Sequence, residues 1–433
     1  MLNDFRQLLR QNRNYRYTWI GQVVSEIGDH FNNIAVFSLA METTHSGLVV
    51  SGVMLSRAVP AVMAGPLAGV VLDRLDRKRI MLASDLIRAV VALAFVLTVH
   101  HHQTSLLYGL SALLMFASPF FTSGRTSILP SIASREELHT ANSLTQTTQW
   151  TTLTIGTMIA GLSAASLGYQ WAFVINSLSF LGSAACIWQL RGTGGFRAKR
   201  EALTEDRVVR PWHEYKEGLL YMRSSPLILG IALVGVGWAT GGGAAQILFT
   251  LFGEQVFNRG PAGLGIVWSF AGVGLLVGGA VGHALGKRIT FRGYKQAIVI
   301  CYIVHGGAYV LFSQMRSFAA ALFFIALSRA GVAVSSVLNF SQLLRRVPDE
   351  FRGRVFSTVE SLTWSTMMVS MTVAGIASQY HGPRTIGFAA GVLSSTTAIF
   401  WGWADWKGKL PEPEPSILER EDVEVHGEPR WSG

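Results

Sequence analysis

Four polar side chains recur along one apolar stretch near the N-terminus, and two of them are acids. Gln22, Glu26, Asp29 and Asn33 follow one another at spacings of four, three and four residues. In a helix these spacings place all four side chains on one face. Ionisable groups inside an apolar helix are costly unless they are paired or reach water. We therefore expect this face to line a water-accessible cavity.

Arg57, in the next apolar stretch, is a candidate partner for Asp29. Asp29 lies about 12 residues from the end of its stretch and Arg57 about 9, so their depths differ by roughly 5 Å at the rise of a helix. A direct Asp29–Arg57 pair is therefore feasible. Such a pair would either only neutralise two buried charges, or belong to a site where Asp29 or Glu26 exchanges a proton. Both interpretations stay open at this point.

The elements that must hold these side chains follow from the composition. Half of the residues are hydrophobic and only 14% are charged, whereas soluble proteins carry about a quarter charged residues. A helix needs roughly 20 apolar residues to cross a bilayer, and lipid offers an open backbone no hydrogen-bond partner. We predict an all-α membrane protein with twelve transmembrane helices at about 17–41, 48–72, 80–99, 105–124, 141–164, 170–190, 226–252, 262–285, 294–313, 317–341, 355–379 and 384–406.

The basic residues test this map. Of the 36 Lys and Arg residues, 30 fall in segments on the N-terminal side of the membrane, three in the opposite loops and three (Arg57, Arg88 and Arg329) within spans. Cytoplasmic loops are enriched in Lys and Arg. We therefore expect both termini in the cytoplasm and the chain in the inner (cytoplasmic) membrane. The net charge of +10 reflects these loops and does not indicate a nucleic-acid partner.

The chain divides into two halves of six spans. The loop SREELHTANS (134–143) has a counterpart in PDEFRGRVFS (348–357), about 214 residues later. Duplicated halves of this kind are typical of transporters with a site at mid-membrane. The predicted organisation is an N-terminal six-helix bundle, a cytoplasmic linker, a C-terminal six-helix bundle and a cytoplasmic tail, at 1–190, 191–225, 226–406 and 407–433.

The linker contains one amphipathic segment, WHEYKEGLLYM (212–222). Such a segment lies on a membrane surface as a helix when its apolar face is large enough. A solvated linker with a transient helix is the alternative.

One loop carries a family resemblance. GVVLDRLDRKR (69–79) resembles the signature loop of the major facilitator superfamily, with Asp76 where that family most often has glycine. The resemblance implies the major facilitator fold of two pseudo-symmetric six-helix bundles. It also implies that the aspartate contacts the facing half and helps to close the cytoplasmic side. The expected gating residues are Gly69, Asp73, Arg74 and Arg77.

Further segments resemble the drug:proton antiporter branch that includes macrolide and siderophore exporters. They are RAVP (57–60), SDLIRA (84–89), SPFFTSGRTSILP (118–130) and LHTANSL (138–144). Drug antiporters often have a Gly-Pro pair in the fifth span, where this chain has IGTMIAG with Thr157 in place of proline. The resemblance implies a secondary transporter that works by alternating access.

Polar and aromatic residues elsewhere in the spans are candidates for ligand contact. Aromatic and Met surfaces with few polar groups suit bulky lipophilic ligands, although ordinary helix packing uses the same residue types. Arg329 needs a partner, for which Glu360 is the first candidate, or it binds an anionic substrate. The predicted substrate-binding residues are Gln22, Asn33, Gln146, Gln149, Trp238, Gln246, Arg329, Glu360 and Trp364.

Three functions remain. A proton-coupled exporter of lipophilic or amphipathic compounds comes first, and an exporter or carrier of a specific metabolite such as a siderophore or lipid comes second. A non-transporting membrane sensor comes third. No Gly-rich nucleotide loop, catalytic triad or metal-ligand spacing occurs in the loops, so we expect neither an enzyme nor a cofactor. The expected partners are a small-molecule substrate, protons and the lipid bilayer, and we expect a monomer.

Overall fold

The computed structural model describes residues 2–101, 103–191 and 211–412. The regular secondary structure in these ranges is helical, with no strand. This confirms the predicted all-α class. The linker segment 192–210 and the tail 413–433, for which cytoplasmic positions were expected, lie outside the described residues.

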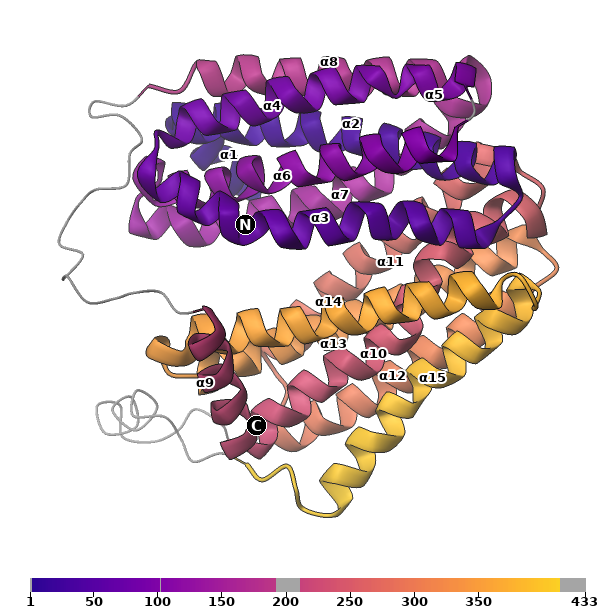
Figure 1. Cartoon of the computed structure of the whole chain (residues 1–433). Helices are drawn as coiled ribbons and strands as arrows, with labels where there is room; N and C mark the ends of the chain where they lie inside the picture. Colours follow the sequence, from indigo (N-terminus) through magenta and orange to yellow (C-terminus); the bar gives the residue numbers. More distant parts are fainter. Residues whose placement is uncertain (1, 102, 192–210, 413–433) are drawn as a thin grey trace.

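The first half of the chain forms one bundle (Figure 1). A short helix, α1 (Leu2–Gln11), leads into it, and one of its six spans is divided at Phe95 into α4 and α5. Its members are α2 (Arg13–Thr44), α3 (Gly47–Arg74), α4 (Arg77–Ala94) with α5 (Val96–His101), α6 (Thr104–Ile132), α7 (Arg135–Leu167) and α8 (Tyr169–Trp188).

The second half forms a similar bundle after the helix α9 (Pro211–Ser224). Its first span ends in a π-helical turn, η1 (Phe252–Val256). Its members are α10 (Pro226–Leu251) with η1, α11 (Gly260–Gly286), α12 (Phe291–Gln314), α13 (Phe318–Arg346), α14 (Asp349–Ala377) and α15 (Pro383–Trp406).

Ten spans in the described ranges are long and apolar enough to cross a membrane by composition alone. The polar helices α2 and α14, of 32 and 29 residues, complete the predicted twelve. Several helices extend past the predicted spans because helix propensity and capping, not hydropathy, set their ends. Thus α7 begins at a capping box in which Ser134 and Glu137 satisfy each other's backbone N–H groups.

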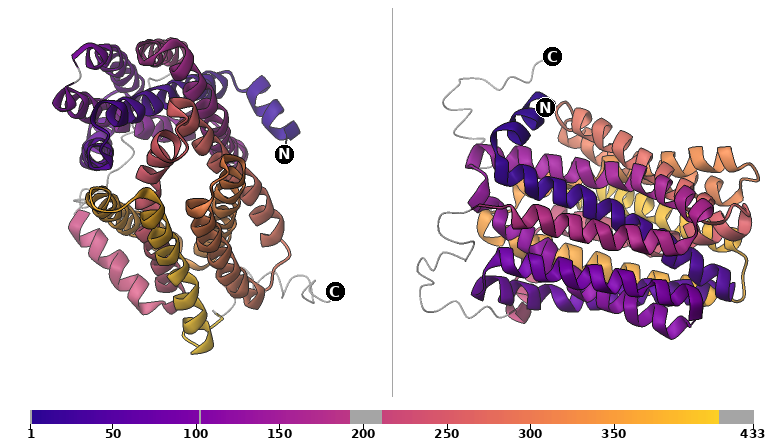
Figure 2. Two further views of the ribbon diagram at one scale, coloured as in Figure 1. Left: turned by 90° about the vertical axis from the view of Figure 1, so that its right-hand side faces the viewer. Right: turned by 90° about the horizontal axis from the view of Figure 1, so that it is seen from above.

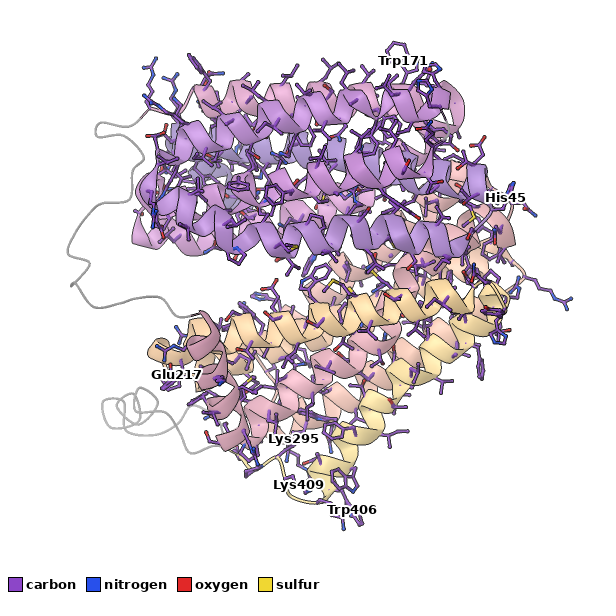
Figure 3. The ribbon with its side chains drawn as sticks, viewed as in Figure 1. His45, Trp171, Glu217, Lys295, Trp406 and Lys409 are labelled. Carbon is purple, nitrogen blue, oxygen red and sulfur yellow. The ribbon has the colours of Figure 1, made fainter. Side chains whose placement is uncertain are left out.

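The two bundles meet at one end and separate towards the other (Figure 1), and the left view of Figure 2 looks onto the end at which they meet. We call the end where α8 stops and α9 starts the linker end, and the opposite end the far end. Figure 3 labels Glu217 at the linker end and His45 at the far end.

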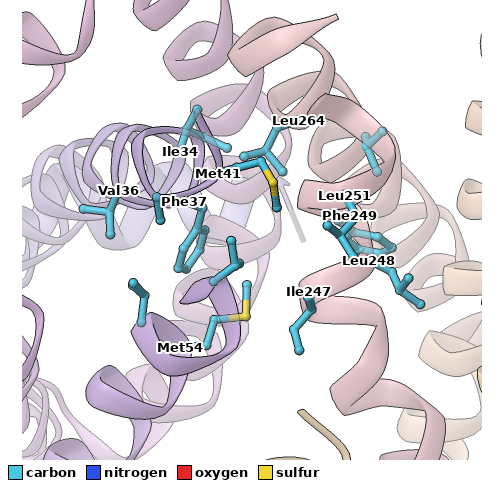
Figure 4. Packing of buried hydrophobic residues seen from close by; sticks show 14 of the residues in the cluster. Ile34, Val36, Phe37, Met41, Met54, Ile247, Leu248, Phe249, Leu251 and Leu264 are labelled. Carbon is cyan, nitrogen blue, oxygen red and sulfur yellow. The ribbon is translucent and has the colours of Figure 1, made fainter. Parts of the chain in front are cut away.

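The inter-bundle contacts concentrate at the far end. The Ser51 hydroxyl on α3 donates to the Met371 carbonyl on α14 at 3.0 Å. Buried apolar side chains of α2 and α3 face those of α10 across the interface (Figure 4). Along α7 and α11 the backbones approach closely, because a Cβ added at Gly161 would lie 2.6 Å from the Pro261 carbonyl oxygen and 2.9 Å from the Gly265 Cα.

The amphipathic segment of the linker is helix α9, and it packs against α14 of the C-terminal bundle. Glu217 forms an ion pair with Arg354 at 2.8 Å, and the Tyr221 and Phe351 rings stack at 4.7 Å. In this structure the segment is a packed helix and not a solvated linker with a transient helix. Specific contacts hold the described part of α9 against the start of α14.

Candidate functional site

A cavity of about 390 Å³ lies between the two bundles. The N-terminal bundle contributes most of its wall through α2, α3, α6 and α7, and the C-terminal bundle closes it through α10, α11 and α14. The lining residues are Asp29, His30, Asn33, Ile34, Phe37, Met54, Arg57, Ala58, Ala61, Met115, Leu153, Thr157, Gln246, Trp268, Trp364 and Met371.

The polar face of α2 opens onto this cavity at Asp29 and Asn33. The Asp29 Oδ1 atom is buried and has no hydrogen-bond partner among the described residues. His30 lies beside Asp29 and packs against the backbone of α7, where a Cβ added at Gly156 would come within 2.7 Å of the His30 Cδ2. An unsatisfied carboxylate oxygen in the wall of a cavity is suited to binding a proton, a water molecule or a cationic ligand group.

Arg57 lines the same cavity but does not form the direct pair with Asp29 that its depth in the span made feasible. Its guanidinium group donates instead to Asn32 Oδ1 at 3.1 Å and to Asn33 Oδ1. Asp29 still interacts electrostatically with Arg57 and Arg88. The direct pair, which is feasible from the sequence, is absent in this structure, and the guanidinium binds two amide oxygens at consecutive positions of α2 instead.

Glu26 lies one turn from Asp29 and outside the lining of the cavity. Its carboxylate accepts hydrogen bonds from Gln22 at 2.8 Å and Thr152 at 2.9 Å. Its Oε1 atom lies 3.7 Å from an Arg125 nitrogen. Gln22 and Arg125 also border a second cavity of about 30 Å³, which has the size of one water molecule.

Arg125 was not predicted as a site residue, because it directly follows the predicted span 105–124 and was therefore assigned to a loop. The structure places it inside α6, which runs seven residues further to Ile132. The polar Ser and Thr residues around Arg125 hid the continuation of the helix. The nearby acid on α2 was the signal that could have indicated a membrane-embedded partner.

A second buried pair, Asp85–Arg88 on α4, was also missed. The Arg88 guanidinium lies 4.5 Å from the Phe121 ring centroid and 4.3 Å from that of Phe180. The spacing of three residues on one helix, which allows a local ion pair, was the available signal. When the Asp85–Arg88 pair is included, the membrane-embedded acids described above in the N-terminal bundle are equal in number to the arginines. The three acids are Glu26, Asp29 and Asp85, and the three arginines are Arg57, Arg88 and Arg125.

The predicted substrate-binding residues separate into two groups. Asn33, Gln246 and Trp364 line the cavity, together with the unpredicted Trp268. Four others lie outside its wall: Gln22 beside Glu26, Gln146 and Gln149 exposed on α7, and Trp238 on α10, partly buried against the core.

The predicted Arg329–Glu360 pair is wrong. Arg329 on α13 is buried, and its guanidinium lies 5.0 Å from the centroid of the Phe249 ring. Glu360 is exposed on α14. The two helices turn these residues to different sides of the bundle, which hydropathy alone does not reveal.

The signature loop is open in this conformation. Asp73 and Arg74 are exposed, and nothing lies within 4 Å of a Cβ added at Gly69. Arg77 donates to the Ser127 carbonyl within its own bundle at 2.7 Å. The expected contact of Asp73 with the facing half is therefore absent here, because the bundles are separated at this end.

Asp76, the departure from the family pattern, caps α4 by accepting from the Arg79 backbone N–H at 2.9 Å. Thr157, the other departure, lines the cavity, and its hydroxyl donates to the Leu153 carbonyl. Within the described ranges, no group of three or more His, Cys, Asp or Glu side chains is arranged to hold a metal ion.

Several known proteins are similar to this chain in sequence. The chain is 26% identical to macrolide efflux protein A of Streptococcus pyogenes over 88% of this chain and 92% of that protein. It is 25% identical to a putative bacilysin exporter of Bacillus subtilis over 80% of this chain and 84% of that one. It is 26% identical to the multidrug efflux pump Tap of Mycolicibacterium fortuitum over 80% and 85% of the two chains.

Solved structures share the fold at low identity. The nucleoside transporter NupG matches with a TM-score of 0.71 at 12% identity, over 89% of this chain and 99% of that one. A bacterial homologue of the iron transporter ferroportin, in its inward-facing state, matches with a TM-score of 0.65 at 18% identity, over 93% and 99% of the two chains. Residues 18–365 match the Major Facilitator Superfamily. The chain therefore belongs to the Major Facilitator Superfamily and is a membrane transporter, not an enzyme.

Proposed function

We propose that this transporter exports lipophilic or amphipathic small molecules in exchange for protons. The observation that carries the proposal is the cavity between the bundles, which holds an acid with an unsatisfied oxygen, Asp29, beside Arg57 in an otherwise largely apolar wall. A site of this composition can exchange a proton against a bulky ligand that needs little directional hydrogen bonding.

The orientation follows from the basic residues. The loops at the linker end hold nearly all of the Lys and Arg outside the spans, so we assign this end to the cytoplasm and the chain to the bacterial inner membrane. Both termini are then cytoplasmic. The conformation described here is accordingly open to the cytoplasm and closed at the external face.

The proposed cycle moves protons along the polar face of α2. A proton that enters from the external side binds at Asp29, and Glu26 with its Gln22 and Arg125 neighbours receives it on the cytoplasmic side. Gly69, Asp73, Arg74 and Arg77 close the cytoplasmic end when the bundles rock to the opposite state. Because the ligand and the proton compete for one site, export of the ligand is coupled to entry of the proton.

The walls support the substrate class. Trp268, Trp364, Met54 and Met371 offer broad, polarizable surfaces, while Gln246 and Asn33 supply isolated polar contacts. Three relatives are named for efflux or export, one of macrolides and one of several drugs. A single chain forms the whole cavity, so we propose that a monomer is sufficient for transport.

Export of one specific metabolite is the second candidate. It is supported by the putative bacilysin exporters among the relatives and by the presence of both a carboxylate and a guanidinium in the cavity wall. These opposite charges suit a ligand that carries both an amine and a carboxylate. A narrow substrate range in the assay below would favour this candidate.

The test is transport in vesicles that contain the purified protein. A pH gradient is imposed, and the movement of fluorescent dyes, macrolides and siderophores is followed. We expect uphill movement by the native protein and its loss in Asp29→Asn, with partial loss in Glu26→Gln. Asp405→Asn is the matched control, since Asp405 pairs with Lys295 at the linker end, away from the cavity. Full gradient-driven transport by both Asp29→Asn and Glu26→Gln would contradict the mechanism.

A further inference from the structure

The closed far end contains an acid that the proposed cycle does not use. Glu254 lies in η1 of the C-terminal bundle, and its Oε1 atom accepts a hydrogen bond from the Ser38 hydroxyl of α2 at 2.5 Å. Ser38 is completely buried. This hydrogen bond therefore joins the two bundles across a surface that must separate when the far end opens.

The π-helical turn directs two consecutive side chains at α2. The next residue, Gln255, donates to the Met41 sulfur at 3.1 Å and to the His45 carbonyl at 3.3 Å. Gly253 permits the wider turn to lie against α11, because an added Cβ would come within 2.5 Å of the Leu264 nitrogen. Single π-helical turns often occur at functional positions.

A second acid stands beside this contact. Glu42 on α2 accepts a hydrogen bond from the Tyr169 hydroxyl of α8 at 2.5 Å and interacts electrostatically with Glu254. His45 contributes its carbonyl oxygen to the contact, and the Arg259 guanidinium lies over the Phe318 ring at 4.7 Å. In the described ranges no ion pair links a cation to Glu42 or Glu254.

We propose that Glu254 is a second proton-binding residue of the transport cycle, which lets the far end stay closed when protonated and favours its opening when ionised beside Glu42. Two neighbouring carboxylates from opposite bundles repel when both are charged, and a single proton removes that repulsion. Because Ser38 donates to Glu254, its hydrogen bond survives in either state. The proton therefore changes the repulsion and not the hydrogen bond.

This inference rests on the proposed function for its direction. A proton that arrives from the external side closes the far end behind it and favours the conformation open at the linker end. The relevant change is a population shift between two arrangements of the bundles, and such couplings are typically about 5-fold to 150-fold.

The test measures the far-end separation directly and needs no substrate. Spin labels at Thr43→Cys and Tyr380→Cys report the distance between the bundles by double electron–electron resonance, with Cys186→Ser and Cys301→Ser as background. Both labelled positions are exposed. In the labelled protein that carries no other substitution, we expect the population with the long distance to rise at least about fivefold between about pH 5.5 and about pH 8.5.

The variants separate charge from structure. Glu254→Gln keeps an acceptor for Ser38 but has no charge, so its pH response should fall below about twofold. Glu42→Gln should flatten the response in the same way. Ser38→Ala should raise the open population at every pH while keeping the response. Glu217→Gln, at the linker end, is the matched control and should behave as the native chain.

Retention of the native pH response in Glu254→Gln would overturn the inference. If that happens while vesicle transport still depends on Asp29, only the role of Glu254 fails. If the response is lost in Glu254→Gln but the native protein shows no gradient-driven transport, the proposed function fails and the proton-dependent closure stands.

Discussion

Arg125 of α6 lies 3.7 Å from Glu26 of α2, measured between Nη1 and Oε1, and this ion pair joins two helices of the N-terminal bundle. The side chains are only 12% and 21% exposed, so neither charge is well hydrated without the other. Removing one partner of such a pair leaves an uncompensated buried charge.

We therefore predict that Arg125→Gln lowers the free energy of unfolding by about 3–5 kcal/mol. Adding Glu26→Gln should restore most of the loss, since no charge then stays unpaired. Thermal unfolding in detergent measures both effects. Arg354→Gln is the comparison, because its pair with Glu217 is more exposed and should contribute about 0–1 kcal/mol. Equal losses in Arg125→Gln and Arg354→Gln would contradict the assignment of a membrane-embedded pair.

Arg57→Lys should weaken substrate binding although it keeps the charge. A lysine ammonium cannot hold the Asn32 and Asn33 amides in the same fixed plane, so Asn33 loses its orientation in the cavity wall. A loss of about 1–2 kcal/mol corresponds to an increase in KM of roughly 5-fold to 30-fold. Initial transport rates at several dye concentrations provide the measurement, and an unchanged KM would show that Arg57 acts by charge alone.

Trp364→Ala should reduce the affinity for lipophilic ligands. Trp364 is 43% exposed although it lies on the cavity wall, which leaves its indole ring accessible to a ligand. Loss of an aromatic contact surface should weaken dye binding by about 2 kcal/mol or more, or roughly 30-fold. Fluorescence polarisation of bound dye gives the affinity. Trp406→Ala, at the exposed end of α15, serves as the control and should leave it unchanged.

Two glycines should differ in how a larger side chain changes the melting temperature. Gly161 touches the backbone of α11, so Gly161→Leu should force α7 and α11 apart and lower the melting temperature. Gly69 has open space around it in this conformation, so Gly69→Leu should leave the melting temperature within about 1–2 °C of native.

The same Gly69→Leu change should nevertheless slow transport by about tenfold or more, because a bulky side chain obstructs closure of the linker end. Transport rates in vesicles, compared with those of Gly382→Leu at an equally open surface position, provide the check. Normal transport by Gly69→Leu would mean that the signature loop does not approach the other bundle at this position.

The helices, the two bundles and the family could be predicted from the sequence, because hydropathy, basic loops and one motif all report on neighbours close in the chain. The polar face of α2 was also predictable, since helical spacing fixes it. The partners of its residues were not. Arg57 binds Asn32 and Asn33, Arg125 lies on a helix that extends beyond its predicted end, and Glu360 does not contact Arg329.

Those errors share a physical cause. Which face of one helix meets which face of another depends on rotation about each axis, and a change of one residue in helix register turns a side chain by about 100°. The inter-bundle contacts of Glu254 and Ser38 were missed for the same reason. Two polar residues 216 positions apart give no local signal of proximity.

The balance of three acids and three arginines in the N-terminal bundle has an electrical consequence. With all six ionised, these residues contribute no net charge to the moving bundle, so each proton taken up adds one full positive charge. In a membrane that is negative inside, a potential of 100 mV favours inward movement of that charge by about 2.3 kcal/mol if it crosses the whole bilayer. For an exchange of one proton per ligand, we expect that a voltage imposed with potassium and valinomycin, at equal pH on both sides, drives export of an uncharged dye, and that exchange for a singly charged cationic dye is insensitive to it.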